Sequence, residues 1–317
     1  MTIRFRLLLF AVLATPANQG FQAPVVDRLL DPFAAGWMLA DTNGDGIVDF
    51  VAGKVVVPAN PSAAENAAAA DIAARLGFSS TGLTPPLVIP ANEDRHDGPR
   101  IFVGGISAPY PLQPEEGGVF AVDGNLALFG HDDAGLLAAA EAFSSRAPYL
   151  WKVPGDKLTA LTDAVKAKPV GLTYLKGKTG INRVFFEGSV TSDDLAAAIK
   201  KIANVHELVV SGVSAVSDKA MSGETPPAPP TAAPADAEAG PQHLDLATLY
   251  TMHGLFRGTA RMPVPSNLDS QLYVPAGKAG ITMANLAARM GLETTGITLP
   301  LATPDPGAAV KDVRTKS

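Results

Sequence analysis

Residues 70–87 read ADIAARLGFSSTGLTPPL, and residues 284–301 repeat this sequence as ANLAARMGLETTGITLPL. A Val-Pro-Ala sequence precedes both stretches, at residues 57–59 and 274–276. A repeat of this length, separated by more than the length of a domain, indicates two homologous modules rather than one large catalytic core. The duplication therefore decides the fold that we expect for this chain.

Each copy of the repeat predicts an amphipathic helix. In the first copy, Ser62 and Glu65 form a capping box at the helix start, and Gly77 is expected to end the helix just after Leu76. Apolar residues follow the helical spacing in both copies, at Ala69, Ile72, Ala73 and Leu76 and at the equivalent Met283, Leu286, Ala287 and Met290. We expect the same helix face to be buried in the two copies.

Short apolar runs predict strands around the first helix, at residues 51–57, 87–89, 101–103, 118–122 and 126–129. Asp123-Gly124 between the last two runs is a hairpin signal, and a second helix is expected from about residue 132 to 144. A smaller unit has a strand at 183–186, a helix capped by residues 191–194 and a strand at 207–210. A right-handed crossover would make these two strands parallel.

The pattern predicts an α/β fold of tandem small modules with mixed sheets, since 317 residues give room for about two domains. The expected parts are an export signal at 1–23, a first module with its acidic loop at 24–152, a small unit at 153–216, a Pro/Ala-rich linker at 217–243 and a partial second module at 244–317. Only residues 302–317 follow the second repeat. We therefore expect an incomplete, partly disordered second copy and a shortened version of a longer repeat protein.

The first residues predict export. Arg4 and Arg6 precede an apolar run at 7–14, and small residues near Ala17 or Ala23 offer a cleavage site. This run is too short to cross a bilayer, so we expect a secreted or periplasmic protein with no integral membrane segment. The net charge of -6 and the pI near 5.4 argue against a nucleic-acid partner. The chain has no cysteine, which excludes disulfides, thiolate zinc sites and a cysteine nucleophile.

Residues 51–151 carry a strand ending in Val-Gly, a glycine-bounded strand pair and a helix with the pattern G-x-x-x-x-G-L, at Gly130, Gly135 and Leu136. An aromatic pair, Tyr149 and Trp151, closes this region. The order resembles the non-catalytic α/β domain that precedes the barrel in secreted hexosaminidases and alpha-glucuronidases. It is also similar to the α/β modules of the periplasmic regulatory subunit of cellulose synthase. The resemblance implies an accessory, carbohydrate-associated domain and supplies no catalytic residues.

The acidic segment DTNGDGIVD at 41–49 has the spacing of a calcium loop. Oxygen ligands fall at loop positions 1, 3, 5, 7 and 9, which are Asp41, Asn43, Asp45, the backbone carbonyl of Ile47, and Asp49. The segment resembles the loops of FG-GAP and dockerin-type repeats. Ala52 stands where an EF-hand has its bidentate glutamate, so the expected affinity is weak. The alternative is a turn whose polar side chains satisfy its own backbone.

No group of residues identifies a reaction, and we predict no catalytic and no cofactor-binding residue. His131, Asp132 and Asp133 lie at a strand-to-helix turn, where they would act as a base or metal ligand or, more simply, as a helix cap beside a solvated histidine. The pairs His96-Asp97 and Glu115-Glu116 are weaker candidates. Phosphate-binding glycine motifs and G-x-S-x-G are missing from the sequence. Tyr149 and Trp151 would stack on a sugar or cover the end of a core.

These observations predict an exported, non-catalytic modular protein that acts as a scaffold or binds a polysaccharide or an envelope protein. One alternative is the N-terminal fragment of a secreted carbohydrate-active hydrolase whose catalytic domain lies beyond Ser317. Another is a calcium-dependent adhesion module, for which calcium would be the cofactor.

Overall fold

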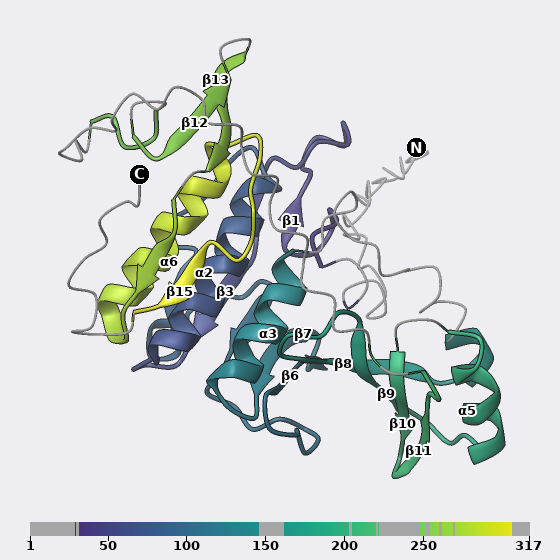
Figure 1. Ribbon diagram of the computed structural model, residues 1–317. Coiled ribbons are helices and arrows are strands. Elements are labelled where there is room, and N and C mark those ends of the chain that lie inside the picture. The colour runs from purple at the N-terminus through teal and green to yellow at the C-terminus, as the bar shows by residue number, and fades with distance from the viewer. Residues whose placement is uncertain are drawn as a thin grey trace, which may run out of the picture.

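The computed structural model describes residues 29, 32–145, 162–202, 205–219, 221, 247–251, 254–259, 262–268 and 270–305. The predicted export signal, the aromatic pair Tyr149 and Trp151, and most of the predicted linker lie outside these residues. The described part is an α/β structure, as the sequence predicted, with one large mixed sheet and three two-stranded sheets (Figure 1).

The large sheet has nine strands in the order β11-β10-β9-β8-β6-β7-β5-β3-β4. Four neighbouring strands run parallel, namely β3 (Lys54–Val57), β4 (Val88–Pro90), β5 (Arg100–Val103) and β7 (Asn125–Gly130). β6 (Glu116–Val122) runs antiparallel to β7. The turn between them has positive φ angles at Asp123 and Gly124, which confirms the predicted hairpin. A single-turn helix, η1 (Ala91–Glu93), follows β4.

The smaller predicted unit belongs to this same sheet. β9 (Ile181–Glu187), α5 (Ser192–Ile199) and β10 (Val205–Val210) form the expected strand–helix–strand piece with parallel strands. Two strands of this part of the sheet were not predicted, namely β8 (Lys168–Leu175) and β11 (Val213–Val216). β8 pairs with both β6 and β9, so the sheet runs without a break across the boundary expected at residue 153.

Helix α2 (Ala63–Phe78) begins with the predicted capping box at Ser62 and Glu65. Its end differs from the prediction, because Gly77 lies within the helix and is buried. A Cβ atom on Gly77 would fall on the carbonyl oxygen of Ala288 in α6 (Gly277–Leu292). Gly77 is therefore required for close contact between the two helices rather than for helix termination.

The structure extends the repeat beyond the part that is recognisable in the sequence. β14 (Leu272–Val274) and β15 (Ala302–Pro304) pair in parallel in the same register as β3 and β4. Upstream, β1 (Leu39–Ala40) and β2 (Phe50–Val51) form a hairpin that aligns with the hairpin of β12 (Phe256–Thr259) and β13 (Met262–Leu268). Leu39 pairs with Val51 and Phe256 pairs with Leu268, which are equivalent positions. Each copy is thus a hairpin, a strand, a helix and a strand.

The two copies pack against each other through α2 and α6, which lie side by side (Figure 1). The contacts are reciprocal. Asp71 Oδ1 accepts hydrogen bonds from the backbone amides of Leu301 and Ala302 at 2.7 and 2.9 Å. The equivalent Asn285 accepts from Leu87 and Val88 at 2.7 and 3.0 Å. Each helix therefore covers the edge strand of the other copy, which protects both sheets from further pairing at these edges.

The main core lies between the helices and one face of the large sheet, where α2 and α3 (Asp133–Ser144) cover the strands. A smaller aromatic cluster covers the opposite face. It contains Phe120, Phe129 and Phe185, and Tyr110 from the β5–β6 connection stacks on Phe185 at 4.3 Å between ring centroids. A cavity opens at the carboxyl ends of the parallel strands β3, β5 and β7.

Candidate functional site

A cavity of about 550 Å³ lies at the carboxyl ends of β3, β5 and β7. From β3 the chain passes through α2 to β4 on one side and then returns to β5 on the other side. Ligands of open α/β sheets bind at such a switch point. The lining residues come from the starts of α2 and α3 and from the loop after β5; they are Ser62, Glu65, residues 104–108, residues 129–133 and Leu136.

The α2 wall of the cavity is closed to phosphate. Glu65 Oε2 accepts from the backbone amide of Ser62 at 2.8 Å, while the Ser62 hydroxyl accepts from the amide of Glu65 at 3.1 Å. The carboxylate thus occupies the helix N-terminus, where a phosphate would otherwise bind. Gly104 has a φ of 66°, and a Cβ atom there would fall on the Glu65 carboxylate. The positive φ favours glycine at this position, and the missing side chain leaves room for the Glu65 carboxylate.

The α3 wall holds the predicted residues His131, Asp132 and Asp133. Asp132 caps α3, because its Oδ1 accepts from the backbone amide of Gly135 at 2.8 Å. Its Oδ2 accepts from the backbone amide of Glu115 at 2.9 Å. The hydrogen bonds from Glu115 and Gly135 hold the pKa of Asp132 below its ordinary value. His131 is exposed, and its Nδ1 lies 2.9 Å from the carbonyl oxygen of Leu112. The simpler alternative, a helix cap beside a solvated histidine, describes this turn.

The cavity is lined by apolar side chains and by carboxylates. Phe129 and Leu136 form an apolar floor, and Ile106 stands at the rim with 49% of its surface exposed. Three side chains of the lining are carboxylates, Glu65, Asp132 and Asp133, and none of the lining residues that the structure describes is lysine or arginine. The cavity therefore offers hydrogen-bond acceptors and an apolar rim, and it repels anionic ligands.

Sequence reasoning found only part of this site. It identified the turn at His131 and a strand ending in Val-Gly, but it did not bring His131, Gly104 and Gly105 together with Glu65 or Ile106. The available signal was the position of the two glycines directly after a buried strand, since carboxyl ends of neighbouring parallel strands meet at one edge of a sheet.

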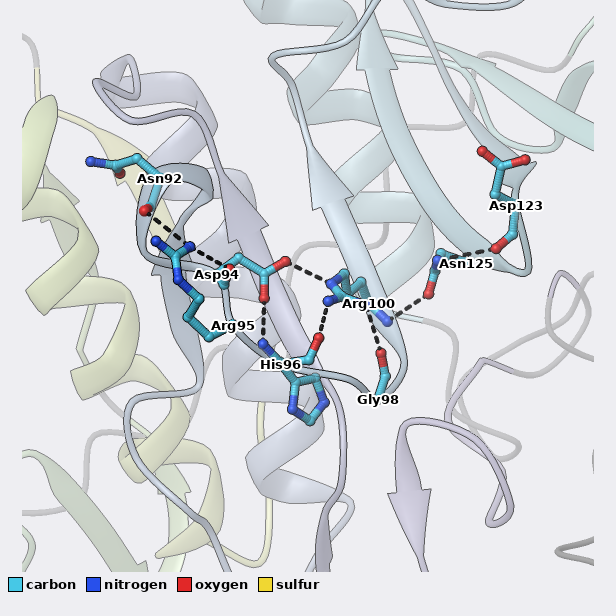
Figure 2. Close-up of polar contacts among 8 residues, drawn as sticks. All are labelled: Asn92, Asp94, Arg95, His96, Gly98, Arg100, Asp123 and Asn125. Atoms are coloured by element: carbon cyan, nitrogen blue, oxygen red, sulfur yellow. Dashed lines mark hydrogen bonds and ion pairs between the residues drawn. The ribbon is translucent and has the colours of Figure 1, made fainter.

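The other histidine candidate lies in a structural loop at the opposite end of β5 (Figure 2). Arg100 pairs with Asp94 at 2.6 Å and donates to the carbonyl oxygens of Gly98, at 3.1 Å, and His96. Burial favours the neutral acid at Asp94, but hydrogen bonds from the His96 amide and Arg100 outweigh it and lower the pKa of Asp94. Asn125 accepts from the backbone amide of Arg100 at 2.9 Å, which ties the loop to β7. These contacts fix the loop between η1 and β5, so the polar residues of this loop have a structural role.

The predicted calcium loop hydrogen-bonds its own backbone. Asp41 accepts from the amides of Gly44 and Gly46 at 2.7 and 2.8 Å, and Asp45 accepts from Ile47 at 2.8 Å. The side-chain oxygen Oδ1 of Asn43 accepts from the backbone amide of Asp45 at 3.0 Å. Hydrogen bonds from the hydroxyl and amide of Thr42 lower the pKa of Asp49.

The oxygen ligands of this loop are of the kind that calcium prefers. Within the ranges that the structure describes, no three Asp, Glu or His side chains converge as a metal site requires. In this conformation the loop matches the alternative of a self-satisfied turn, and calcium binding by Asp41, Asn43, Asp45, Ile47 and Asp49 stays a prediction.

Glu115 and Glu116 do not form a carboxylate pair. Glu115 is exposed and lies 3.5 Å from Lys176, whereas Glu116 is buried and pairs with Arg183. Glu115 lies in the turn before β6 with a φ of 60°, whereas Glu116 is the first residue of β6, which accounts for the separation.

Neither a protein-family model nor a curated protein matches this chain in sequence. In the part of the chain that the structure describes, no helix combines the length and apolar composition that crossing a bilayer requires.

Proposed function

We propose that this protein is a non-catalytic binding module whose switch-point cavity takes a neutral saccharide segment. The observation that carries the proposal is the lining itself: carboxylate and backbone acceptors, an apolar rim at Ile106, and no lysine or arginine among the described lining residues. Sugar hydroxyls donate to such acceptors, and the apolar face of a sugar ring packs on an exposed aliphatic side chain. The volume of about 550 Å³ lies within the range of ligand pockets.

The engagement of two of the three lining carboxylates in helix capping favours binding over catalysis. The Glu65 and Asp132 carboxylates are engaged by backbone amides at the starts of α2 and α3. A general acid or base needs a proton that it can exchange with a substrate, and these two groups are used for helix capping. The resemblance to accessory domains of carbohydrate-active enzymes supports the same function. Export, an envelope location and the hydrolase-fragment alternative stay predictions.

Asp133 provides a sharp test because it lines the cavity, is exposed, and lies in the first turn of α3. Asp133→Asn should weaken binding of neutral oligosaccharides about three- to tenfold, because it replaces a charged hydrogen-bond acceptor with a weaker neutral one. Isothermal titration calorimetry with a panel of soluble oligosaccharides measures this. The matched control is Asp193→Asn, which changes an exposed first-turn acid of α5 away from the cavity. Equal weakening in both variants, or no binding to any saccharide of the panel, would contradict the proposal.

A calcium-dependent module is a second candidate, and one observation favours it. The hairpin of β12 and β13 has the same register as the hairpin of β1 and β2, although its sequence has no DTNGDGIVD segment. A hairpin of this register therefore forms without the acidic residues that the segment 41–49 carries between β1 and β2. Residues that the fold does not require are candidates for binding.

Calcium at millimolar concentration should then raise the melting temperature of the protein. A concentration ten times the dissociation constant stabilises the native state by about 1.4 kcal/mol. Asp45→Asn should remove most of this gain, because it removes one charged ligand from the predicted set. Differential scanning calorimetry with calcium, and with magnesium as the ionic-strength control, gives the answer. An unchanged melting temperature in calcium would eliminate this candidate.

A further inference from the structure

Asp71 and Asn285 occupy equivalent positions on α2 and α6, and both accept two backbone amides from the other copy. Asn285 does more than accept. Its Nδ2 donates to the carbonyl oxygens of Val88 at 2.8 Å and Ile281 at 3.0 Å. The carboxamide thus serves as acceptor and donor in the same contact between the copies.

A carboxyl group accepts the two amides in either protonation state, but it can take both roles of the Asn285 carboxamide only when it is protonated. A neutral acid has one accepting oxygen and one O–H donor, whereas a carboxylate only accepts. Asp71 is completely buried, so its ionised form is penalised by the loss of water. Burial, opposed by the amides of Ala302 and Leu301, raises the pKa of Asp71 to about 7.

The charged groups around Asp71 either raise its pKa as well or interact with other residues. Glu141 on α3 raises the pKa of Asp71 further, because a second negative charge disfavours ionisation. Arg75, one turn along α2, lies over the rings of Phe33 and Phe78, and Arg289 on α6 pairs with Glu293. β15 and β4 carry no titratable side chain. The other titratable side chains on the elements packed against α2 are Lys54, Arg100, Asp133, Tyr273 and Lys278.

We propose that Asp71 is a pH-sensitive latch between the two copies, in which the neutral acid holds the last strand of the second copy on α2 and ionisation releases it. The latch is one-sided, because the equivalent Asn285 does not titrate. Since the native state holds the Asp71 proton more tightly than an opened state with solvated Asp71, docking is strongest at acidic pH. The opening equilibrium constant attributable to Asp71 rises about tenfold for each pH unit between about 4 and 7 and levels off above this range.

Hydrogen exchange of single backbone amides tests the latch in the full chain. After correction for intrinsic exchange rates, protection of the Leu301 and Ala302 amides should fall about 50-fold between pH 5 and 7 in the wild-type protein. In Asp71→Asn their protection should stay constant over this range. Asn285→Asp should add a second pH-dependent loss at the Leu87 and Val88 amides. The amide of Val209 in β10, far from the helix pair, is the internal reference.

Parallel pH profiles of protection in the wild-type protein and Asp71→Asn would overturn the proposal. If Asp71→Asn does not fold, a titration of the wild-type protein still tests the proposal. The ¹³C shift of the Asp71 carboxyl group in the wild-type protein should titrate with a midpoint near 7. A midpoint near the ordinary aspartate value of about 4 would refute the latch.

Discussion

Gly77→Leu is expected to destabilise the protein by at least about 3 kcal/mol, because the two copies meet at this residue without space for a side chain. A Cβ atom on Gly77 would fall on the Ala288 carbonyl oxygen, and one on Gly291 would fall on the carbonyl oxygen of Ala74. Both obstacles are helix backbone, which cannot move aside as a flexible side chain would. The helices must therefore separate, and the reciprocal contacts of Asp71 and Asn285 would be lost with them.

Urea unfolding followed by circular dichroism measures this effect. Gly291→Leu should have a similar effect, and the double variant should lose much less than the sum, because both changes disrupt one contact. Thr282→Leu places the same side chain on an exposed position of α6 and is the matched control, with an expected change within about 0.5 kcal/mol. A Gly77→Leu protein as stable as the control would show that the two helices do not pack as described.

The sequence predicted the first helix and its capping box because these depend on local spacing, which Ser62, Glu65 and the alanine-rich face display directly. It failed at Gly77, where a glycine near the expected helix end was interpreted as a stop signal. The residue that actually requires a glycine there is Ala288, more than two hundred positions away in the chain. Contacts between the two copies join residues that are far apart in the chain, so they leave no local pattern in the sequence.

The extent of the repeat was missed for a related reason. The hairpins of β1–β2 and β12–β13 share their register, but their sequences have diverged, since a paired backbone constrains side chains less than a close helix contact does. The second copy was expected to be partly disordered for lack of sheet partners. In the described residues, β14, α6 and β15 are all formed and pack on the first copy instead.

The candidate site was predictable in its parts only. His131 and Asp132 stood out because polar residues after a strand are visible in the sequence, and their capping role followed from helix chemistry. The cavity itself depends on the order of strands, with β5 on the opposite side of β3 from β4. Strand order in a sheet is set by packing of the whole chain, so Glu65 and Ile106 could not be assigned to one site beforehand.

The second large effect concerns the buried ion pair of Glu116 and Arg183, which links β6 to β9 across β8. Glu116 is completely buried, and its oxygens accept from Asn182 at 2.7 Å, from Arg183 Nε at 2.8 Å and from the amide of Gln113 at 2.7 Å. Burial alone would raise the pKa of Glu116, but these hydrogen bonds, that of Arg183 first, outweigh it and hold the pKa below its ordinary value. This carboxylate is thus fully satisfied only in its ionised form.

Glu116→Gln should therefore lower the free energy of unfolding by about 3–5 kcal/mol, because it leaves the Arg183 guanidinium buried without a counter-charge. The neighbouring Glu115→Gln is the matched control, since Glu115 is exposed and its contact with Lys176 contributes less than about 1 kcal/mol. Chemical unfolding at pH 7 compares the two variants, and an equal, small loss in both would contradict the role assigned to the pair.

The pH dependence of this pair has the opposite sign to that of Asp71. A native pKa below the unfolded value gives stability that is present above the unfolded pKa of Glu116 and is lost as the pH falls through the native pKa. Wild-type protein should therefore lose, on acidification below the ordinary glutamate pKa, a part of its stability that Glu116→Gln has already lost. Replacing both partners by apolar residues, in Glu116→Leu with Arg183→Met, should recover much of the loss, because no uncompensated charge then remains buried. Failure of the double variant to exceed Glu116→Gln would mean that Asn182 and Gln113, rather than the charge pair, determine the stability of this junction.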